Sequence, residues 1–260
     1  MSMLLVKISA GVLVGTLVGL TGLGGGAALL PILIFGLRVP PISAVGSAAA
    51  FNALTKIGAG FMHWRQRSVD WRLVSLLALG SVPGAFCGVM VLARLRSLYD
   101  SGVNDILRTA IGILLIGIPV LYVAQRFLAR GLSRLNRPQR LPYIGISLIG
   151  VVGGLMVGMS SVGSGTIIML FLMILVHASP AILVGTNIVH AIVLTGVTSL
   201  LHLRLGTVDS TLVFPLVAGS LPGSVLGAQL SQRFPGHWIQ GTLYIVLFVT
   251  GAGMALGILK

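Results

Sequence analysis

Long apolar stretches separated by short polar connections make up most of the chain. They lie at residues 3–20, 27–37, 42–63, 73–93, 108–128, 143–159, 166–176, 180–203, 211–231 and 238–259. Most are near 20 residues, the length at which a helix crosses about 30 Å of hydrocarbon. Two of them, 27–37 and 166–176, are about half that length. The pattern predicts an all-α integral membrane protein with two half-length helices near the membrane centre.

The chain also repeats itself. Displaced by 139 residues without a gap, Gly11–Gly88 aligns with Gly150–Gly227 at 23 identities in 78 positions. The identities include many glycines and two prolines, which constrain backbone geometry and helix packing. A duplicated apolar half is a common plan for membrane transporters. We therefore expect a first transmembrane repeat at 1–128, a basic cytoplasmic linker at 129–142 and a second repeat at 143–260.

The orientation of the two homologous helical repeats depends on the half-length helices. If each short helix crosses the membrane, every repeat has five crossings, the repeats are inverted and both termini lie outside. If it only enters and returns, every repeat has four crossings, the repeats are parallel and both termini lie inside. The parallel arrangement places eleven Lys and Arg inside against five outside, and the inverted one nine against seven. Charge favours the parallel arrangement slightly and leaves both open.

Composition agrees with a location in the lipid bilayer. The chain is 56% hydrophobic and 8% charged, which is too little polar surface to cover a water-soluble globule. Its net charge of +13 does not indicate nucleic acid, because many of the cations crowd the connection between the repeats. These are Arg126, Arg130, Arg134, Arg137 and Arg140, and the positive-inside rule places them in the cytoplasm. The sequence does not decide between a monomer and a homodimer.

Glycine-rich segments precede both half-length stretches. The first glycine run is Gly22-Leu23-Gly24-Gly25-Gly26, and the second is Ser161-Val162-Gly163-Ser164-Gly165. We expect each to break the helix and to leave backbone N–H groups at the start of the next one, where anions bind. In a bilayer such backbone must be buried in protein or line a watery cavity. The predicted substrate-binding residues here are Gly24, Gly25, Gly26, Gly163, Ser164 and Gly165, although close helix packing is an alternative role for the glycines.

Polar side chains lie deep in the third long helix of each repeat. The first copy holds Ser47, Asn52 and Lys56, and the second holds Thr186, Asn187 and His190. Polar groups in hydrocarbon are costly, so they usually face a pathway or the bundle interior. Because Asn52 and Lys56 are four residues apart, they share a helix face. We predict that all six contribute to the substrate site, with helix-to-helix hydrogen bonds as the alternative.

The absence of carboxylates from the apolar stretches indicates the kind of ligand. The chain has no glutamate, and its four aspartates all fall in predicted loops: Asp70, Asp100, Asp105 and Asp209. Membrane-buried carboxylates commonly hold Na⁺, divalent metals or a relayed proton. Glycine amides, hydroxyls, amides and a lysine or histidine suit a small anion instead. We expect no metal and no cofactor.

Two further repeated features have structural interpretations. Glycines spaced four apart, as in Gly11-x-x-x-Gly15-x-x-x-Gly19 and Gly80-x-x-x-Gly84-x-x-x-Gly88, predict close helix packing on one face. The loops that contain His63 to Asp70 and His202 to Asp209 predict Arg–Asp neutralisation and an aspartate cap on the following helix.

In combination, these motifs resemble the TauE/SafE family of sulfite exporters, also called the toluene-sulfonate uptake permease family. The resemblance covers about Gly11 to Gly251 and rests on GTLVGLTGLGGGAALLPILIFG, Ala44-Val45-Gly46-Ser47, the His63 to Asp70 loop and Gly80-Ser81-x-Pro83-Gly84, each echoed in the second repeat. It implies an inner-membrane permease for sulfite, thiosulfate or organosulfonates, coupled to an ion gradient. The chain departs from the pattern where serines replace two glycines of the second run, and Lys56 occurs in one copy only.

The leading hypothesis is a secondary transporter that works by alternating access around a site at the repeat interface. An anion channel is an alternative. A second alternative is an intramembrane hydrolase with Ser164 as nucleophile and His190 or His202 as base. We expect a transporter and not an enzyme, and the absence of a P-loop motif argues against ATP-driven transport by this chain alone.

Overall fold

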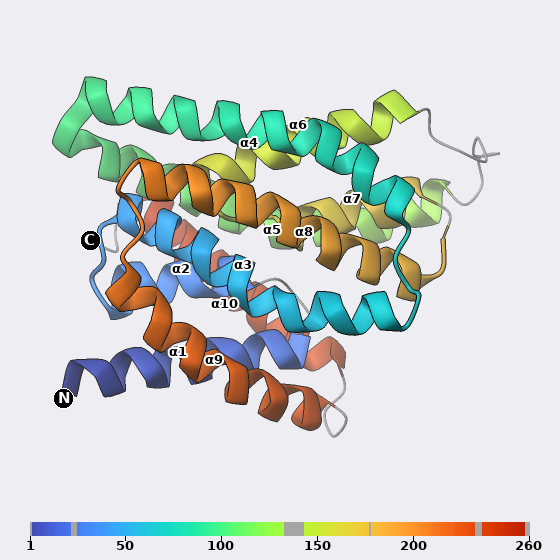
Figure 1. The fold of residues 1–260 in the computed structure, drawn as a ribbon, viewed down its shortest axis with the longest axis horizontal. Coiled ribbons are helices and arrows are strands. Elements are labelled where there is room, and N and C mark those ends of the chain that lie inside the picture. The colour runs from blue at the N-terminus through green and yellow to red at the C-terminus, as the bar shows by residue number, and fades with distance from the viewer. Residues whose placement is uncertain (1, 22–24, 133–142, 177, 232–235, 258–260) are drawn as a thin grey trace.

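The computed structural model describes residues 2–21, 25–132, 143–176, 178–231 and 236–257, which form helices joined by short loops (Figure 1). The helices are α1 (Ser2–Thr21), α2 (Gly25–Pro31), α3 (Pro41–Arg65), α4 (Trp71–Tyr99), α5 (Val103–Leu132), α6 (Tyr143–Ser160), α7 (Ile167–Leu175), α8 (Pro180–Arg204), α9 (Ser210–Ser231) and α10 (Gly236–Ala255). A π-helical turn, η1 (Ile32–Gly36), continues α2, and a 3₁₀ turn, η2 (Asp100–Gly102), precedes α5. Six of these helices, α1, α4, α5, α6, α8 and α9, are long and apolar enough to cross a membrane. The prediction of an all-α multi-pass membrane protein is confirmed.

Side-chain caps fix where α4 and α9 begin. Asp70 accepts hydrogen bonds from the backbone N–H groups of Arg72 and Leu73, at 3.0 and 3.1 Å. Asp209 accepts from the backbone N–H of Thr211 at 2.9 Å. The predicted caps are confirmed, and each satisfies donors that a helix start leaves without a partner. The Arg–Asp neutralisation is not found, because the only ion pair among the described residues joins Arg108 to Asp105 at 4.0 Å.

Glycine contacts hold α1 against α9 and α4 against α6, as the four-residue spacing predicts. A Cβ at Gly11 would overlap the backbone of Leu216, and one at Gly15 would overlap the backbone of Ser220. Glycines 80, 84 and 88 of α4 face residues 147, 151 and 155 of α6 in the same way. Only glycine allows backbones to approach this closely. Because residue numbers rise together across both contacts, the two helices of each pair run parallel.

The central helices α3 and α8 run antiparallel. Gly46 at the start of α3 packs on Thr207, which follows α8, while Gly185 at the start of α8 packs on Ser68, which follows α3. Each helix therefore begins beside the loop that follows the other. Figure 1 shows the two helices crossing the middle of the molecule.

These pairings determine the course of the chain through α2 and α7. Since α9 begins beside the start of α3 and runs parallel to α1, both α1 and α3 begin on the same side of the molecule. Residues 25–40, with α2 and η1, therefore lead back across it. Helix α4 begins beside the start of α8 and runs parallel to α6, so α6 and α8 also begin on the same side of the molecule. The segment between them, with α7, therefore leads back across it as well.

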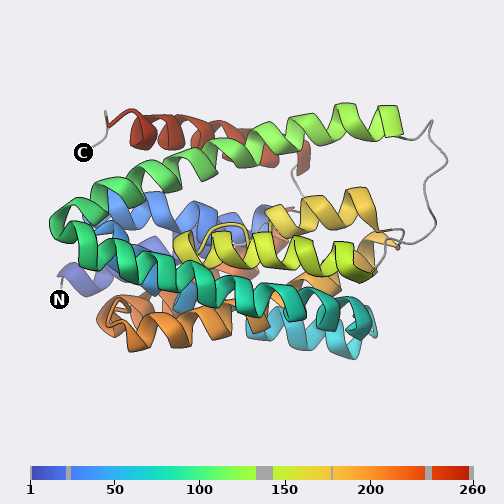
Figure 2. The ribbon, with the colours of Figure 1, turned by 90° about the horizontal axis from the view of Figure 1, so that it is seen from above.

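The apolar core centres on α2, and a separate helix pair covers one flank. Leu29, Leu30 and Leu33 are fully buried among residues of α3, α5, α9 and α10. Helices α5 and α10 lie side by side on the flank (Figure 2), where Gly112 packs against the backbone of Gly251. Helix α5 continues through Leu132, so it includes the first residues of the expected linker, whose remaining residues lie outside the described part.

Candidate functional site

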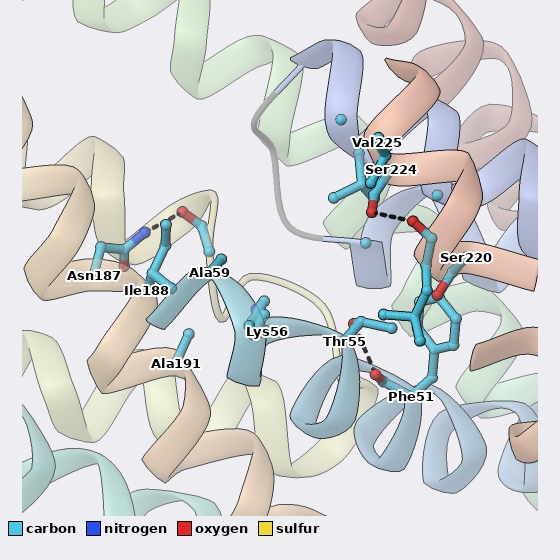
Figure 3. Close-up of a pocket in the computed structure, with 17 residues that line it drawn as sticks. Phe51, Thr55, Lys56, Ala59, Asn187, Ile188, Ala191, Ser220, Ser224 and Val225 are labelled. Carbon is cyan, nitrogen blue, oxygen red and sulfur yellow. Dashed lines mark hydrogen bonds between the residues drawn. The ribbon is translucent and has the colours of Figure 1, made fainter. Parts of the chain in front are cut away.

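A cavity of about 460 Å³ lies where α1, α3, α8 and α9 meet (Figure 3). Its wall includes one described residue of the first glycine run, Gly25, and one of the second, Gly165. The other polar residues of the wall are Thr55, Lys56, Asn187, Ser220 and Ser224. The remainder is apolar or glycine: Gly15, Val18, Gly19, Phe51, Gly58, Ala59, Ile188, Ala191, Leu221 and Val225. The cavity therefore lies between helices of both repeats.

Lys56 is the one charged side chain among the described residues of this wall. It extends from α3, and its Nζ donates to Ser164 Oγ in the second glycine run at 2.9 Å. An ammonium group has three donor hydrogens, so this contact leaves others for a ligand. The described residues of the wall include no carboxylate that could neutralise the charge. A partly buried cation without a counter-charge gives the cavity a positive potential and favours an anion.

Asn187 fixes the backbone of the second glycine run. Its Nδ2 donates to the Gly165 carbonyl oxygen at 2.8 Å, and its buried Oδ1 has no protein partner. Asn187 is about 5% exposed and comes from α8, so it connects the central helix of the second repeat to the segment before α7. This contact holds irregular backbone at the cavity wall, where membrane proteins tolerate it.

The hydroxyl groups of the wall donate to their own helices. Thr55 Oγ1 donates to the Phe51 carbonyl at 2.8 Å, and Ser224 Oγ donates to the Leu221 carbonyl at 2.8 Å. Ser220 Oγ donates to the carbonyl of Val217 at 3.1 Å. In this arrangement the hydroxyl hydrogens are occupied. Among the described side chains, Lys56 is thus the principal donor that faces the cavity.

A closed polar cluster lies beside the cavity, where the two glycine runs meet. Asn52 and Ser161 are both fully buried, and Asn52 Oδ1, Asn52 Nδ2 and Ser161 Oγ have no hydrogen-bond partner among the described residues. A Cβ at Gly26 would lie 2.8 Å from Asn52 Nδ2 and 2.6 Å from the Ser161 carbonyl oxygen. Ser161 has a φ of 58°, a conformation that costs energy for a residue with a side chain. Each unpaired buried group costs about 1–3 kcal/mol, so a ligand or water that pairs them would be stabilised here.

Three of the predicted site residues are not among the described residues of the cavity wall. Ser47 Oγ accepts from the Asp209 backbone N–H at 3.0 Å, and Thr186 Oγ1 accepts from that of Asp70 at 2.9 Å. His190 is fully buried, and its Nε2 lies 2.8 Å from Ser81 Oγ on α4. All three make the contacts between elements that the sequence left as the alternative.

The other predicted residues divide between the cavity and its surroundings. The wall contains four of them, Gly25, Lys56, Gly165 and Asn187. Ser164 is not part of the wall but accepts the hydrogen bond from Lys56. Gly26 and Asn52 belong to the closed polar cluster, and Gly163 has a φ of 97° that favours glycine. Gly24 lies outside the described residues.

Sequence reasoning missed the contributions of α9 and of the apolar wall. Ser220 and Ser224 follow Gly219 and Gly223 in a glycine-striped helix, and their position at the cavity depends on the α1–α9 pairing. Phe51 and Val225 give no signal in a chain that is apolar almost throughout. The sequence offered one indication of a polar group on this helix, which is that Ser220 aligns with Ser81 in the self-alignment.

The histidines proposed as bases for Ser164 have other partners. His202 Nδ1 lies 2.8 Å from Thr207 Oγ1, and its Nε2 lies 3.0 Å from the Gly158 carbonyl oxygen. His190 contacts Ser81. In the described part of the chain, no hydrogen bond joins Ser164 to a histidine, and no cluster of His, Cys, Asp and Glu has the arrangement of a metal site.

Comparison with known proteins shows that the chain is similar to membrane transporters. The family model described as Sulfite exporter TauE/SafE matches residues 8–254. Probable membrane transporter protein YjnA of Bacillus subtilis (strain 168) is 36% identical over 248 residues, which cover 94% of this chain and 96% of the relative. YdhB of the same organism, also named a probable membrane transporter protein, is 22% identical over 239 residues, 92% of this chain and 95% of the relative. MJ0441 of Methanocaldococcus jannaschii, with the same description, is 25% identical over 264 residues, 96% and 94% respectively. No solved structure matches the chain.

Proposed function

The chain belongs to the TauE/SafE sulfite exporter family of membrane transporters, and we propose that it moves a small sulfur-containing anion across the cytoplasmic membrane by secondary transport. Sulfite, thiosulfate and organosulfonates are the candidate substrates. The observation that carries this proposal is the single cation, Lys56, in a cavity whose wall contains no carboxylate. A site of this charge attracts an anion and repels Na⁺ or a divalent cation.

Inverted repeats are the second part of the proposal. The equivalent helices α3 and α8 are antiparallel, and their contacts are reciprocal. Ser47 holds the backbone of Asp209, while Thr186, equivalent to Ser47, holds that of Asp70, equivalent to Asp209. These contacts support the inverted arrangement over the parallel one that charge slightly favours. The charge count differs by only two residues between the arrangements, so it is the weaker criterion.

Alternating access follows from inverted repeats around a shared cavity. When the two repeats exchange conformations, a site between them opens to the opposite side of the membrane. Lys56 from the first repeat and the second glycine run would then both contact the anion in transit. A channel would conduct without this exchange, so saturable uptake and stimulation by anion on the opposite side distinguish the transporter from the channel.

The contact between Lys56 and Ser164 also suits a hydrolase with a serine–lysine pair. The position equivalent to Ser164 is Gly25, which supports a backbone role for both glycine runs and weighs against a nucleophile. Treatment with a fluorophosphonate probe separates the two functions. We expect no label on Ser164, whereas stoichiometric labelling of Ser164 would favour the hydrolase.

Transport by purified protein in liposomes tests the proposed function. Proteoliposomes and protein-free liposomes are given labelled sulfite, thiosulfate or an organosulfonate, and uptake is measured against external concentration. We expect protein-dependent, saturable uptake of at least one of these anions, accelerated by unlabelled anion inside. Equal uptake with and without protein for all three would contradict the proposal.

A further inference from the structure

The loop between α3 and α4 carries exposed arginines beside exposed aromatic rings, and we infer that it binds the headgroup of an anionic phospholipid. The surface, called the basic loop below, consists of Trp64, Arg65, Arg67, Trp71 and Arg72, all of which are exposed. None of these residues belongs to the cavity wall. The basic loop is therefore separate from the proposed transport site, and its ligand is a component of the membrane itself.

The loop that aligns with the basic loop at the 139-residue offset has the same local structure and different side chains. His63 Nδ1 lies 2.8 Å from Ser68 Oγ, and His202 Nδ1 lies 2.8 Å from Thr207 Oγ1. An aspartate caps the following helix in both loops. Four of the five residues of the basic loop are nevertheless replaced, since Leu203, Gly206, Ser210 and Thr211 align with Trp64, Arg67, Trp71 and Arg72. The loop structure therefore forms without these aromatic and basic side chains, which points to a role other than folding.

Arg67 has a backbone conformation that favours glycine. Its φ is 54°, and the φ of Gly206 at the aligned position is 66°. This left-handed conformation costs energy for a residue with a Cβ, whereas glycine adopts it freely. In the described part of the chain, no hydrogen bond or ion pair engages the guanidinium group of Arg67 or of Arg65. A ligand outside the protein would explain why an arginine occupies this position.

The charges of the basic loop suit a phosphate group. A guanidinium group presents several N–H donors in one plane, which match the oxygens of a phosphate. Asp70 is the one carboxylate between residues 63 and 72, and its Oδ1 accepts from the backbone of α4, so it serves as a cap. The Arg72 guanidinium lies over the ring of Tyr143, with its Cζ 4.5 Å from the ring centroid, and donates to the Tyr143 hydroxyl. This contact holds one cation in place beside α6.

The basic loop lies where headgroups of the cytoplasmic leaflet are expected. It joins two central helices at the end of the molecule where α6 begins (Figure 1). Trp64, Trp71 and Tyr143 are each more than half exposed, and tryptophan and tyrosine gather at the level of lipid headgroups. The parallel and the inverted arrangements both place this loop in the cytoplasm, because α3 runs inward in each. Anionic lipids of the cytoplasmic leaflet attract basic segments at this level.

Thermal unfolding in detergent, with added phosphatidylglycerol or zwitterionic phosphatidylcholine, tests this surface in the wild type, Arg65→Ala, Arg67→Gly and Arg204→Ala. Each variant lacks one positive charge, and Arg204 aligns with Arg65, so Arg204→Ala is the matched control. We expect phosphatidylglycerol to raise the wild-type melting temperature more than phosphatidylcholine does at the same mole fraction. Arg65→Ala and Arg67→Gly should each lose at least half of this difference, and Arg204→Ala should keep it. Without lipid, Arg67→Gly should melt no lower than the wild type, because glycine suits the left-handed backbone.

Several results would overturn the lipid site. Equal stabilisation of the wild type by the two lipids would show that the headgroup charge is not recognised. An equal loss in Arg65→Ala and Arg204→Ala would show a general attraction to a basic protein and no site at the loop. Inorganic phosphate at matched ionic strength should not reproduce the effect, and the same stabilisation by phosphate would identify a free anion as the ligand. If Arg65→Ala does not fold, the comparison of Arg67→Gly with Arg204→Ala decides, and an undiminished lipid effect in Arg67→Gly contradicts the inference.

Discussion

Lys56 Nζ on α3 donates to Ser164 Oγ in the second glycine run at a distance of 2.9 Å, and this contact joins the two repeats at the cavity. The second repeat has no reciprocal contact of this kind. Thr195, equivalent to Lys56, donates to the carbonyl of Ala191 in its own helix at 2.6 Å. Gly25, equivalent to Ser164, has no side chain. The two aligned segments of the sequence therefore differ at the one charged position among the described residues of the cavity wall.

Removing the Ser164 hydroxyl should destabilise the ligand-free protein moderately. Ser164→Ala removes the acceptor of a charged hydrogen bond, and we expect a loss of about 1 kcal/mol because the Lys56 ammonium retains access to water in the cavity. Thermal unfolding in detergent measures the change. Ser224→Ala is the control, since its hydroxyl bonds only within α9, and it should have a smaller effect. Equal melting temperatures of Ser164→Ala and wild type would show that the contact contributes nothing to stability.

Asn52 should be dispensable for folding and required for transport. Its amide is fully buried without a protein partner, so replacement by leucine removes two unpaired polar atoms and should leave stability unchanged or higher. We expect Asn52→Leu to reduce uptake at least tenfold while its melting temperature is maintained.

Asn104 provides the opposite case for comparison. Its Oδ1 accepts from the Ile42 backbone N–H at 3.3 Å, far along the chain from the cavity residues. Asn104→Leu should cost about 1 kcal/mol of stability and leave the concentration for half-maximal uptake unchanged. If Asn52→Leu loses stability and Asn104→Leu does not, Asn52 has a structural role instead.

The contact between α4 and α6 should tolerate nothing larger than glycine. Gly154→Leu would drive a side chain into the backbone of Ser81, and we expect it to prevent accumulation of folded protein. Gly117→Leu on α5 is the control, because a Cβ there meets no atom within 4 Å. Fluorescence-detected size-exclusion chromatography measures the folded fraction. A monodisperse Gly154→Leu protein at the wild-type yield would contradict the close packing of these helices.

The inverted repeats that we propose would place both termini outside the cytoplasm. The native Cys87 is exposed and is first replaced, giving Cys87→Ser, and a cysteine is then introduced by Ser2→Cys. We expect a membrane-impermeant maleimide to label this cysteine in intact cells. Protection in intact cells together with labelling after permeabilisation would support the parallel arrangement.

Apolar periodicity predicted the membrane class, glycine spacing predicted close helix packing but not which helices pair, and the repeated loops predicted the caps at Asp70 and Asp209. These features depend on local sequence. The cavity was predicted only in part, since Lys56, Gly25, Gly165 and Asn187 line it while His190, Ser47 and Thr186 do not. A polar residue at depth satisfies the same pattern whether it faces a ligand or bonds to a neighbouring helix, as His190 does with Ser81. The α9 residues of the wall depend on tertiary packing, which periodicity does not encode.

The most direct test of the central claim, that Lys56 provides the charge that binds a transported anion, is uptake by Lys56→Ala in proteoliposomes. Lys7→Ala is the matched control, because Lys7 bonds to Thr211 at the beginning of α9 and lies outside the cavity wall. At equal amounts of folded protein, we predict that Lys56→Ala loses saturable anion uptake at least tenfold and that Lys7→Ala retains it. Wild-type uptake by Lys56→Ala would contradict the account.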